Sequence, residues 1–296
     1  MAGRVPWTSS TLKLSEAGEF GLLRELERLQ LVSGQDAEGA LLREGRVATT
    51  DVLAEGVHFR LNWTTFRDLG YKAAAVNLSD LAALGADPEG LLVGLGAPGD
   101  ARVEDVVEVY AGLNESGVPV LGGDTTQTPS WILSVTAIGS SERVPGRAGA
   151  EPGDALIVTG PLGASAAGNY VLEHELEGFD ELVRAHRRPP LRLDEGRALA
   201  RIAHALVDLS DGIGSDAARI AERSGVKLVL DVDSIPRAPR IEEVADLPFW
   251  TLGEDYELFA VLAPDDAATS GFPVVGRVED GSGVEPEGLG GWDSFR

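Results

Sequence analysis

The segment 68–84 constrains the fold of this chain more than any other feature, because it predicts a helix that is apolar on most of its circumference. It is rich in alanine and leucine, and Gly85 follows it as a helix end signal. Within it, Asn77 and Asp80 are three residues apart and therefore share a face. An ionised carboxylate in such surroundings is costly unless it is paired or bound to a metal.

Helix-like and strand-like segments alternate around this helix, which predicts an α/β or α+β protein in two halves. The expected helices are 19–31, 68–84, 103–116, 164–173, 194–205 and 215–223. The expected strands are 40–42, 47–50, 91–95, 118–121, 131–138, 155–159, 226–232 and 257–262, with a turn at Glu44–Gly45. Residues 1–15 contain Pro6 and a Ser/Thr cluster, so we expect a flexible leader there. Glycine and proline cluster at 146–154, so we expect a first domain (16–150) and a second domain (151–296).

Composition excludes several classes of protein. The chain has 296 residues, 43% of them hydrophobic, which is enough for a full core. It has no cysteine, which rules out disulfide scaffolds, cysteine-ligated metals and thiol catalysis. Its net charge of -23 repels nucleic acid and anionic membranes. No segment approaches the roughly 20 apolar residues of a membrane helix or the core of a signal peptide, so we expect a cytoplasmic protein with neither kind of partner.

Several aspartates stand where solubility does not explain them, at the ends of apolar strands or inside the apolar helix. They are Asp51, Asp80, Asp124, Asp208 and Asp211, with Asp36 before the first strand pair. Hard oxygen ligands, without cysteine and with only four histidines, select Mg²⁺ or Mn²⁺ over zinc or copper. Magnesium sites combine a few carboxylates with substrate phosphates, so this pattern indicates phosphate chemistry.

Each of these residues also has a structural explanation. Asp36 fits a turn, Asp211 or Ser215 fits a helix N-cap, and Asp124 fits a turn or cap. Asp80 is the hardest to explain in this way, because its neighbours are apolar. The common nucleotide-binding motifs do not identify a site. A P-loop is absent, and the G-x-G-x-x-G match at 94–99 contains Pro98 and lacks the strand–helix context.

Five ordered motifs resemble the thiamine-monophosphate kinase family, within the aminoimidazole-ribonucleotide synthetase-like superfamily. The motifs are TTD with EGVHF (49–51 and 55–59), the stretch 72–86 with NLSDLAA, GGDTT (122–126), DLSDG (208–212) and GEDYEL (253–258). The resemblance runs from residue 18 nearly to the C-terminus. It implies a two-domain α+β fold, and a homodimer in which the N-terminal domains build a β-barrel across the interface.

The resemblance also implies a set of site residues. The metal ligands are expected at Asp36, Thr49, Thr50, Asp51, Asp80, Asp124, Asp208 and Asp211, of which Asp51, Asp80, Asp124 and Asp211 are the catalytic aspartates. ATP contacts are expected at Gly123, Asp124, Arg147 and Ser210, and thiamine monophosphate contacts at His58, Glu254 and Trp292. His58 and Trp292, taken alone, could equally be packing residues.

The chain departs from the family pattern at two motifs. The usual Gly-Asp-Asp is Gly34-Gln35-Asp36, which loses one acid and could alter metal affinity. The usual Gly-Gly-Glu-Asp has Leu252 in place of the first glycine, which could narrow the substrate pocket.

The implied activity is ATP-dependent phosphorylation of thiamine monophosphate, by in-line transfer assisted by several Mg²⁺ ions. Because the acceptor is itself a phosphate, largely dianionic at neutral pH, the reaction needs no general base. Charge repulsion and alignment are then the barrier, and aspartate-held cations can lower it. The alternatives are another ATP-using enzyme of the superfamily, or a non-catalytic nucleotide- or metal-binding regulator. Selenide-using and hydrogenase-maturation members use a cysteine that this chain lacks.

Overall fold

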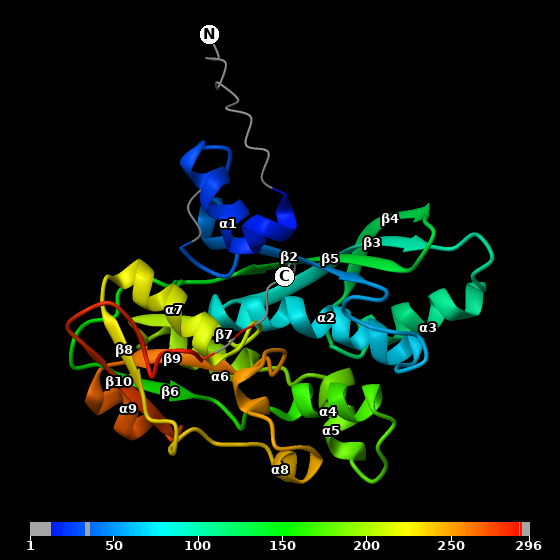
Figure 1. Ribbon diagram of the computed structural model, residues 1–296. Coiled ribbons are helices and arrows are strands. Elements are labelled where there is room, and N and C mark those ends of the chain that lie inside the picture. Colours follow the sequence, from blue (N-terminus) through cyan, green and yellow to red (C-terminus); the bar gives the residue numbers. More distant parts are fainter. Residues whose placement is uncertain (1–12, 33–35, 290, 292–296) are drawn as a thin grey trace.

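The computed structural model describes residues 13–32, 36–289 and 291, which form two sheets with helices between and around them (Figure 1). The first sheet has the strand order β1-β2-β5-β3-β4. β2 pairs antiparallel with β5, β5 antiparallel with β3, and β3 parallel with β4. The strands are β1 (Ala40–Leu41), β2 (Arg46–Ala54), β3 (Asp87–Ala97), β4 (Val120–Gln127) and β5 (Ile132–Ser140).

Helix α2 (Phe66–Ala83) lies between the two sheets, and this explains its apolar circumference (Figure 1). On one side Ala73 and Leu78 join the core of the first sheet, together with α3 (Val103–Asn114). On the other side Ala82 and Ala83 join a cluster that contains strands of the second sheet. The side chain of Thr65 caps the N-terminus of α2 by accepting from the Asp68 backbone N–H.

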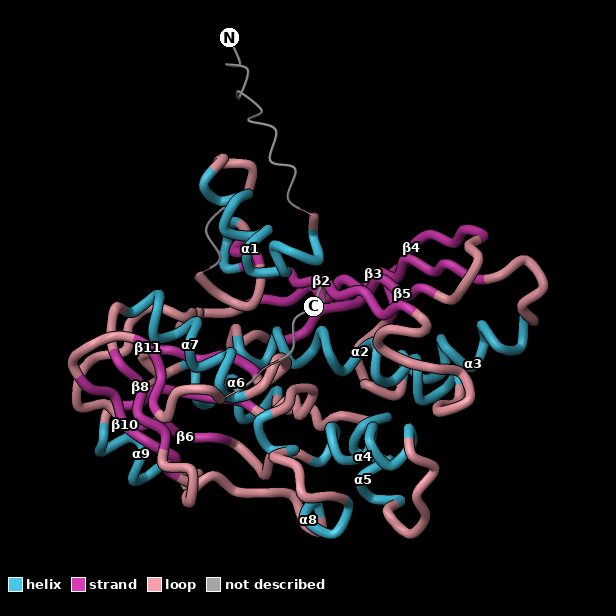
Figure 2. Tube along the Cα trace, viewed as in Figure 1, coloured by secondary structure: helices cyan, strands magenta, loops and turns pink. Residues whose placement is uncertain are grey.

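The second sheet has the strand order β11-β8-β10-β6-β9-β7. Its strands are β6 (Ala155–Val158), β7 (Ala205–Asp208), β8 (Lys227–Leu230), β9 (Leu258–Leu262), β10 (Val274–Glu279) and β11 (Gly283–Glu285). Its helices are α4 (Ala164–Glu173), α5 (Asp180–Arg187), α6 (Leu193–Ala200), α7 (Ile213–Ser224), α8 (Ile241–Val244) and α9 (Pro264–Ser270). Figure 2 shows β8, β10 and β6 below α7, and α4 and α5 side by side in another part of this half.

Most expected elements are present, with shifted ends. Helix α1 (Leu14–Arg28) begins and ends earlier than the expected 19–31, and Gln30 just beyond it has a left-handed backbone with φ 57°. Two short helical turns, η1 (Arg43–Gly45) and η2 (Phe249–Thr251), complete the elements of the described residues. The turn expected at Glu44–Gly45 is confirmed, since both residues have positive φ.

The sequence prediction was wrong in part of 194–205, where the helix ends at Ala200 and strand β7 begins at Ala205. A short apolar run such as 205–208 fits a buried strand or a helix end equally well. Helices α5, α8 and α9 and strands β10 and β11 were not expected either.

The described residues leave part of the outer face of the first sheet uncovered. Val52 and Leu121 are 50% and 59% exposed, and every residue of β4 after Val120 is exposed. Helix α1 lies over the β2 end of this face (Figure 1), tied to α7 by a 2.7 Å ion pair between Glu27 and Arg223. Among the described helices, none combines the length and apolar character needed to cross a membrane.

Candidate active site

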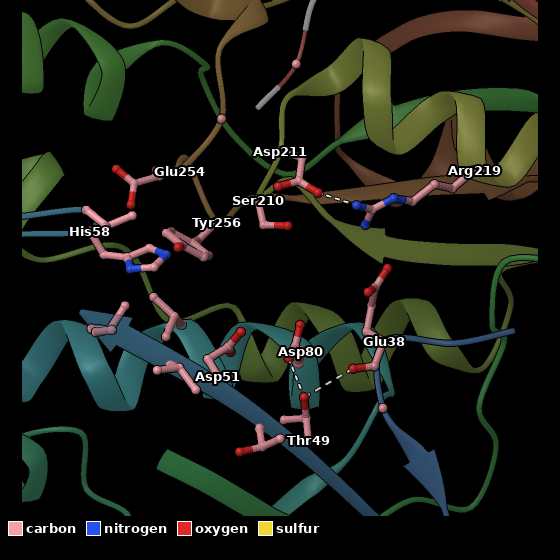
Figure 3. A pocket seen from close by; sticks show the side chains of 18 of the residues that line it. Glu38, Thr49, Asp51, His58, Asp80, Ser210, Asp211, Arg219, Glu254 and Tyr256 are labelled. Atoms are coloured by element: carbon pink, nitrogen blue, oxygen red, sulfur yellow. Dashed lines mark hydrogen bonds and ion pairs between the residues drawn. The ribbon is translucent and has the colours of Figure 1, made fainter. Parts of the chain in front are cut away.

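A cleft of about 1850 Å³ opens between the two halves of the chain. Strand β2 and helix α2 supply one wall, and the loops that follow β7 and η2 supply the other (Figure 3). The cleft has two ends: Glu38, Thr49 and Asp80 lie at one, and His58, Glu254 and Tyr256 lie at the other. Asp51, Ser210 and Asp211 lie between them.

Three carboxylates gather at the first end. Glu38, Asp80 and Asp208 each offer an oxygen, and these oxygens lie within 4.8 Å of one another. Glu38 precedes β1, Asp80 is on α2 and Asp208 ends β7, so both halves of the chain contribute. All the donors are hard oxygens, which suits Mg²⁺ or Mn²⁺.

This cluster carries strong mutual repulsion. Burial, followed by the charges of Asp51, Asp208 and Glu38, raises the pKa of Asp80 well above its usual value. Burial, followed by the charge of Glu38, raises the pKa of Asp208 to about 8. The Ser79 hydroxyl donates a 2.7 Å hydrogen bond to Asp208 and partly offsets this effect. Such a cluster favours the binding of cations.

Thr49 and Thr50 face opposite sides of β2, because successive side chains of a strand alternate. The buried Thr49 hydroxyl donates to Asp80 and lies 3.2 Å from the carbonyl of Glu38. The Thr50 hydroxyl instead donates to the carbonyl of Val135 at 3.1 Å, on the outer side. The structure therefore brings Thr49 into the cluster and turns the Thr50 side chain away from it.

Asp51 is held in the cleft through its backbone. Its N–H donates to the side-chain oxygen of Asn77 at 3.1 Å, and the Asn77 amide in turn donates to the carbonyl of Ala73 at 3.0 Å. Asn77 is buried, so it links β2 to α2 inside the core. This is the structural use of the Asn77 and Asp80 pair that shares one face of the helix.

Asp211 lies in the loop between β7 and α7, where Arg219 donates to its carboxylate (Figure 3). The backbone N–H of Asp211 donates to Asp216 at 3.2 Å, and Arg219 also lies 3.6 Å from Asp216. Burial raises the pKa of Asp216, which the Arg219 charge opposes. Arg219 was not expected from the sequence, and it balances the acids of this loop.

Arg147 and Asp36 occupy different surroundings. The guanidinium of Arg147 donates to both oxygens of Glu38, with an Nε–Oε1 distance of 3.1 Å. The Asp36 carbonyl accepts from the Arg147 backbone N–H at 2.7 Å. The Asp36 carboxylate is 68% exposed and lies 3.5 Å from Arg223. The acid that joins Asp80 and Asp208 is thus Glu38, which sequence reasoning missed.

The other end of the cleft is built on an unusual backbone. Glu254 and Tyr256 both have positive φ, at 68° and 52°, which is rare outside glycine and typical of functional loops. The Glu254 N–H donates to the carbonyl of Ser210 at 2.8 Å, so this loop is fixed to the loop that carries Asp211. Gly253 allows the close approach, because a Cβ there would lie 2.0 Å from the Ser210 oxygen.

His58 faces Glu254 across this end of the cleft (Figure 3). Its Nδ1 accepts a 3.1 Å hydrogen bond from the Ala54 backbone N–H. A neutral ring therefore carries its proton on Nε2. Glu254 is also held by Lys72 and His186, two residues for which the sequence offered no role.

Gly123 and Asp124 lie on β4, and they are not among the residues that line the cleft of this chain. The Asp124 side chain is exposed. Trp292, expected to contact thiamine monophosphate, is outside the described residues.

Both halves of the chain match domains of AIR synthase related proteins: residues 35–141 match the N-terminal domain and residues 151–287 the C-terminal domain. The fold and the site therefore define an AIR synthase related protein with two domains. The chain is 36% identical to thiamine-monophosphate kinase of Mycobacterium tuberculosis (strain ATCC 25618 / H37Rv), covering 95% of this chain and 93% of that protein. It belongs to the thiamine-monophosphate kinase family.

Solved structures agree with this assignment. AaThiL complexed with AMPPCP and TMP superposes with a TM-score of 0.88 at 32% identity, covering 96% of this chain and 99% of that one. HypE of E. coli, a hydrogenase maturation protein, superposes with a TM-score of 0.69 at 19% identity and shares the fold.

Proposed function

We propose that this protein transfers the γ-phosphoryl group of ATP in line to thiamine monophosphate, assisted by several Mg²⁺ ions, and releases thiamine diphosphate. The observation that carries the proposal is the convergence of Glu38, Asp80 and Asp208 from both halves of the chain on one cleft. AaThiL, a similar structure, is complexed with AMPPCP, an ATP analogue, and TMP. Relatives at similar identity are named thiamine-monophosphate kinase.

The residues at the first end of the cleft fit divalent cations. Glu38, Thr49, Asp51, Asp80, Asp208 and Asp211 present oxygens toward or beside the cleft. Burial, and then the negative charge of neighbouring carboxylates, raises the pKa values of Asp80 and Asp208. Bound there, Mg²⁺ ions would supply the positive charge that lets two phosphates approach each other.

The chain's own groups then position the reactants. No side chain needs to remove a proton, because a phosphate monoester loses its second proton with a pKa of roughly 6. The work left to the protein is alignment and charge balance. Arg147 and Ser210 both line the cleft, where each would contact ATP. The Arg147 guanidinium can exchange its contact with Glu38 for phosphate oxygens once cations neutralise that acid.

The second end of the cleft suits the thiamine ring system. Glu254 offers a carboxylate to a cationic thiazolium or to the aminopyrimidine, and His58 offers an N–H donor. Because Glu254 and His58 lie apart from the carboxylate cluster, the phosphate of the substrate would lie between the two ends of the cleft, near Asp51 and Asp211 (Figure 3).

A homodimer with a β-barrel across its interface is part of the proposal. The exposed apolar side chains Val52, Leu92 and Leu121 on the first sheet support it, because a second sheet would cover them. Asp124 and Gly123 would then act at the cleft of the partner copy. Light scattering on the purified protein tests this, and Leu92→Glu is expected to give a monomer. The cytoplasmic location expected from the sequence stays a prediction.

A turnover assay tests the activity. The purified protein with ATP, Mg²⁺ and thiamine monophosphate should form thiamine diphosphate and ADP. Asp51→Ala and Asp80→Ala should each abolish the reaction, while Asp87→Ala, a change at an exposed acid on β3, should not. Unchanged turnover in both cleft variants would contradict the metal site. Absence of turnover in the unchanged protein would favour a non-catalytic regulator.

A further inference from the structure

Lys72 is buried inside the protein and forms an ion pair with Glu254. Its side chain is 4% exposed, and its Nζ lies 3.0 Å from Oε1 of Glu254. Within residues 13–32, 36–289 and 291, Glu254 is the sole acid in ion-pair contact with it. A buried ammonium is costly to keep charged, so a fold that retains it gains something from the pair.

His186 lies beside the second oxygen of the same carboxylate. Its Nδ1 lies 3.4 Å from Oε2 of Glu254 and 3.1 Å from the Ser165 hydroxyl. Burial, followed by the nearby charge of Lys72, lowers the pKa of His186 to about 3. The ring is therefore neutral at neutral pH and adds a polar contact without a second positive charge.

The three residues come from separate parts of the fold. Lys72 is on α2, His186 is on α5, and Glu254 lies in the loop before β9. Lys72 does not line the large cleft; it lies behind Glu254, beside a small adjoining cavity that His58 and His186 also line. It therefore does not reach the phosphates directly.

Glu254 is the residue that these contacts fix. Burial alone would raise the pKa of its carboxyl, but the charge of Lys72 brings that pKa below its usual value. Its backbone is fixed as well, by the left-handed φ of 68° and the 2.8 Å bond to Ser210. About a third of its side chain (32%) stays exposed to the cleft.

We propose that Lys72 and His186 are positioning residues, which hold Glu254 ionised and in one orientation to receive the ring end of thiamine monophosphate. This inference rests on the proposed function and adds two residues to it. Glu254 costs little to reorganise when the substrate arrives, because both of its oxygens are already oriented.

Steady-state kinetics on the full chain separate this role from a structural one. Lys72→Met should raise the KM for thiamine monophosphate by about ten- to a hundredfold, the loss expected for a charge-assisted contact. The KM for ATP should stay within about twofold of the parent value. Lys72→Arg should bring the KM for thiamine monophosphate most of the way back to the parent value. Glu254→Gln should give a similar defect, and the double variant Lys72→Met/Glu254→Gln should be no worse than Glu254→Gln alone.

The matched control is Lys227→Met, which breaks a surface ion pair with Glu285 outside the cleft and should change neither KM. If Lys72→Met fails to fold, His186→Gln tests the same contact from the other side and should raise the same KM. An active parent protein whose KM values are unaffected in the foldable variants overturns the inference alone. Additive losses in the double variant also overturn it. A parent protein that cannot use thiamine monophosphate overturns the proposed function, and this inference with it.

Discussion

The hydroxyl of Ser79 donates a 2.7 Å hydrogen bond to Oδ2 of Asp208, and this bond joins α2 of the first domain to β7 of the second. Both residues are buried. Asp208 is itself a member of the carboxylate cluster, so the packing of the two domains and the assembly of the cluster depend on the same contact.

Ser79→Ala should lower the free energy of unfolding by about 1–3 kcal/mol, because a buried carboxylate loses its donor. It should also raise the Mg²⁺ concentration needed for half-maximal activity, since Asp208 is then less restrained. Denaturant unfolding and a Mg²⁺ titration of turnover measure the two effects. Ser234→Ala is the matched control, because Ser234 donates to Asp231 at 2.6 Å on the surface. Equal losses in both variants would contradict the role given to Ser79.

Asp80→Asn should abolish turnover yet leave the metal-free protein as stable as the parent, or more stable. The pKa of Asp80 is raised by burial and then by its acidic neighbours, so this residue stabilises the fold at low pH and loses that contribution as the pH rises. The stability advantage of Asp80→Asn should therefore grow above about pH 4. Thermal melts across pH measure it, with the exposed Asp87→Asn as control. A variant less stable than the parent at pH 7 would show that the carboxylates do not repel each other.

His186→Gln should flatten the loss of stability in acid. The pKa of His186 is depressed to about 3, so its neutral form stabilises the fold above the usual histidine value. This contribution is lost as the pH falls from about 6.5, at up to about 1.4 kcal/mol per pH unit. Unfolding free energies from pH 7 to pH 4 measure the slope. Substitution of the exposed His174, stacked on Tyr170, is the control. Parallel curves for the parent and His186→Gln would contradict the prediction.

Gly253→Ala should damage the cleft without a change in its chemistry. A Cβ at this position meets the Ser210 carbonyl at 2.0 Å, which forces apart the loops that carry Glu254 and Asp211. We expect a loss of about 1–3 kcal/mol in stability, as for other overpacked sites, and a higher KM for both substrates. Leu252→Ala, at the neighbouring exposed residue of the cleft, should leave stability nearly unchanged. Comparable kinetics in the two variants would show that the loop contact is not needed.

Much of the fold could be predicted from the sequence, because its strongest signals are local. The apolar run around Asp80 and the strand before Asp51 were placed within a few residues of α2 and β2. Strand β7 was missed because the short run 205–208 fits either element, and α5 because its first and last turns carry mostly charged residues.

The candidate site was less predictable, since it depends on contacts between distant segments. Asp80 and Asp208 meet as expected, but nothing in the sequence singles out Glu38, which joins them, while the Asp36 carboxylate lies exposed beside Arg223. The alternation of side chains in β2 could have separated Thr49 from Thr50. Lys72 lies in a recognised motif, yet its pairing with Glu254 becomes visible only when α2 meets the loop before β9.

In the proposed function, carboxylates from both domains hold divalent cations at the point of phosphoryl transfer. Electron paramagnetic resonance can count the Mn²⁺ ions bound to the full chain in the presence of AMPPCP and thiamine monophosphate. We predict more than one bound ion per chain in the parent protein, and at least one fewer in Asp80→Asn. The same number of bound ions in both proteins would contradict a metal site that includes Asp80.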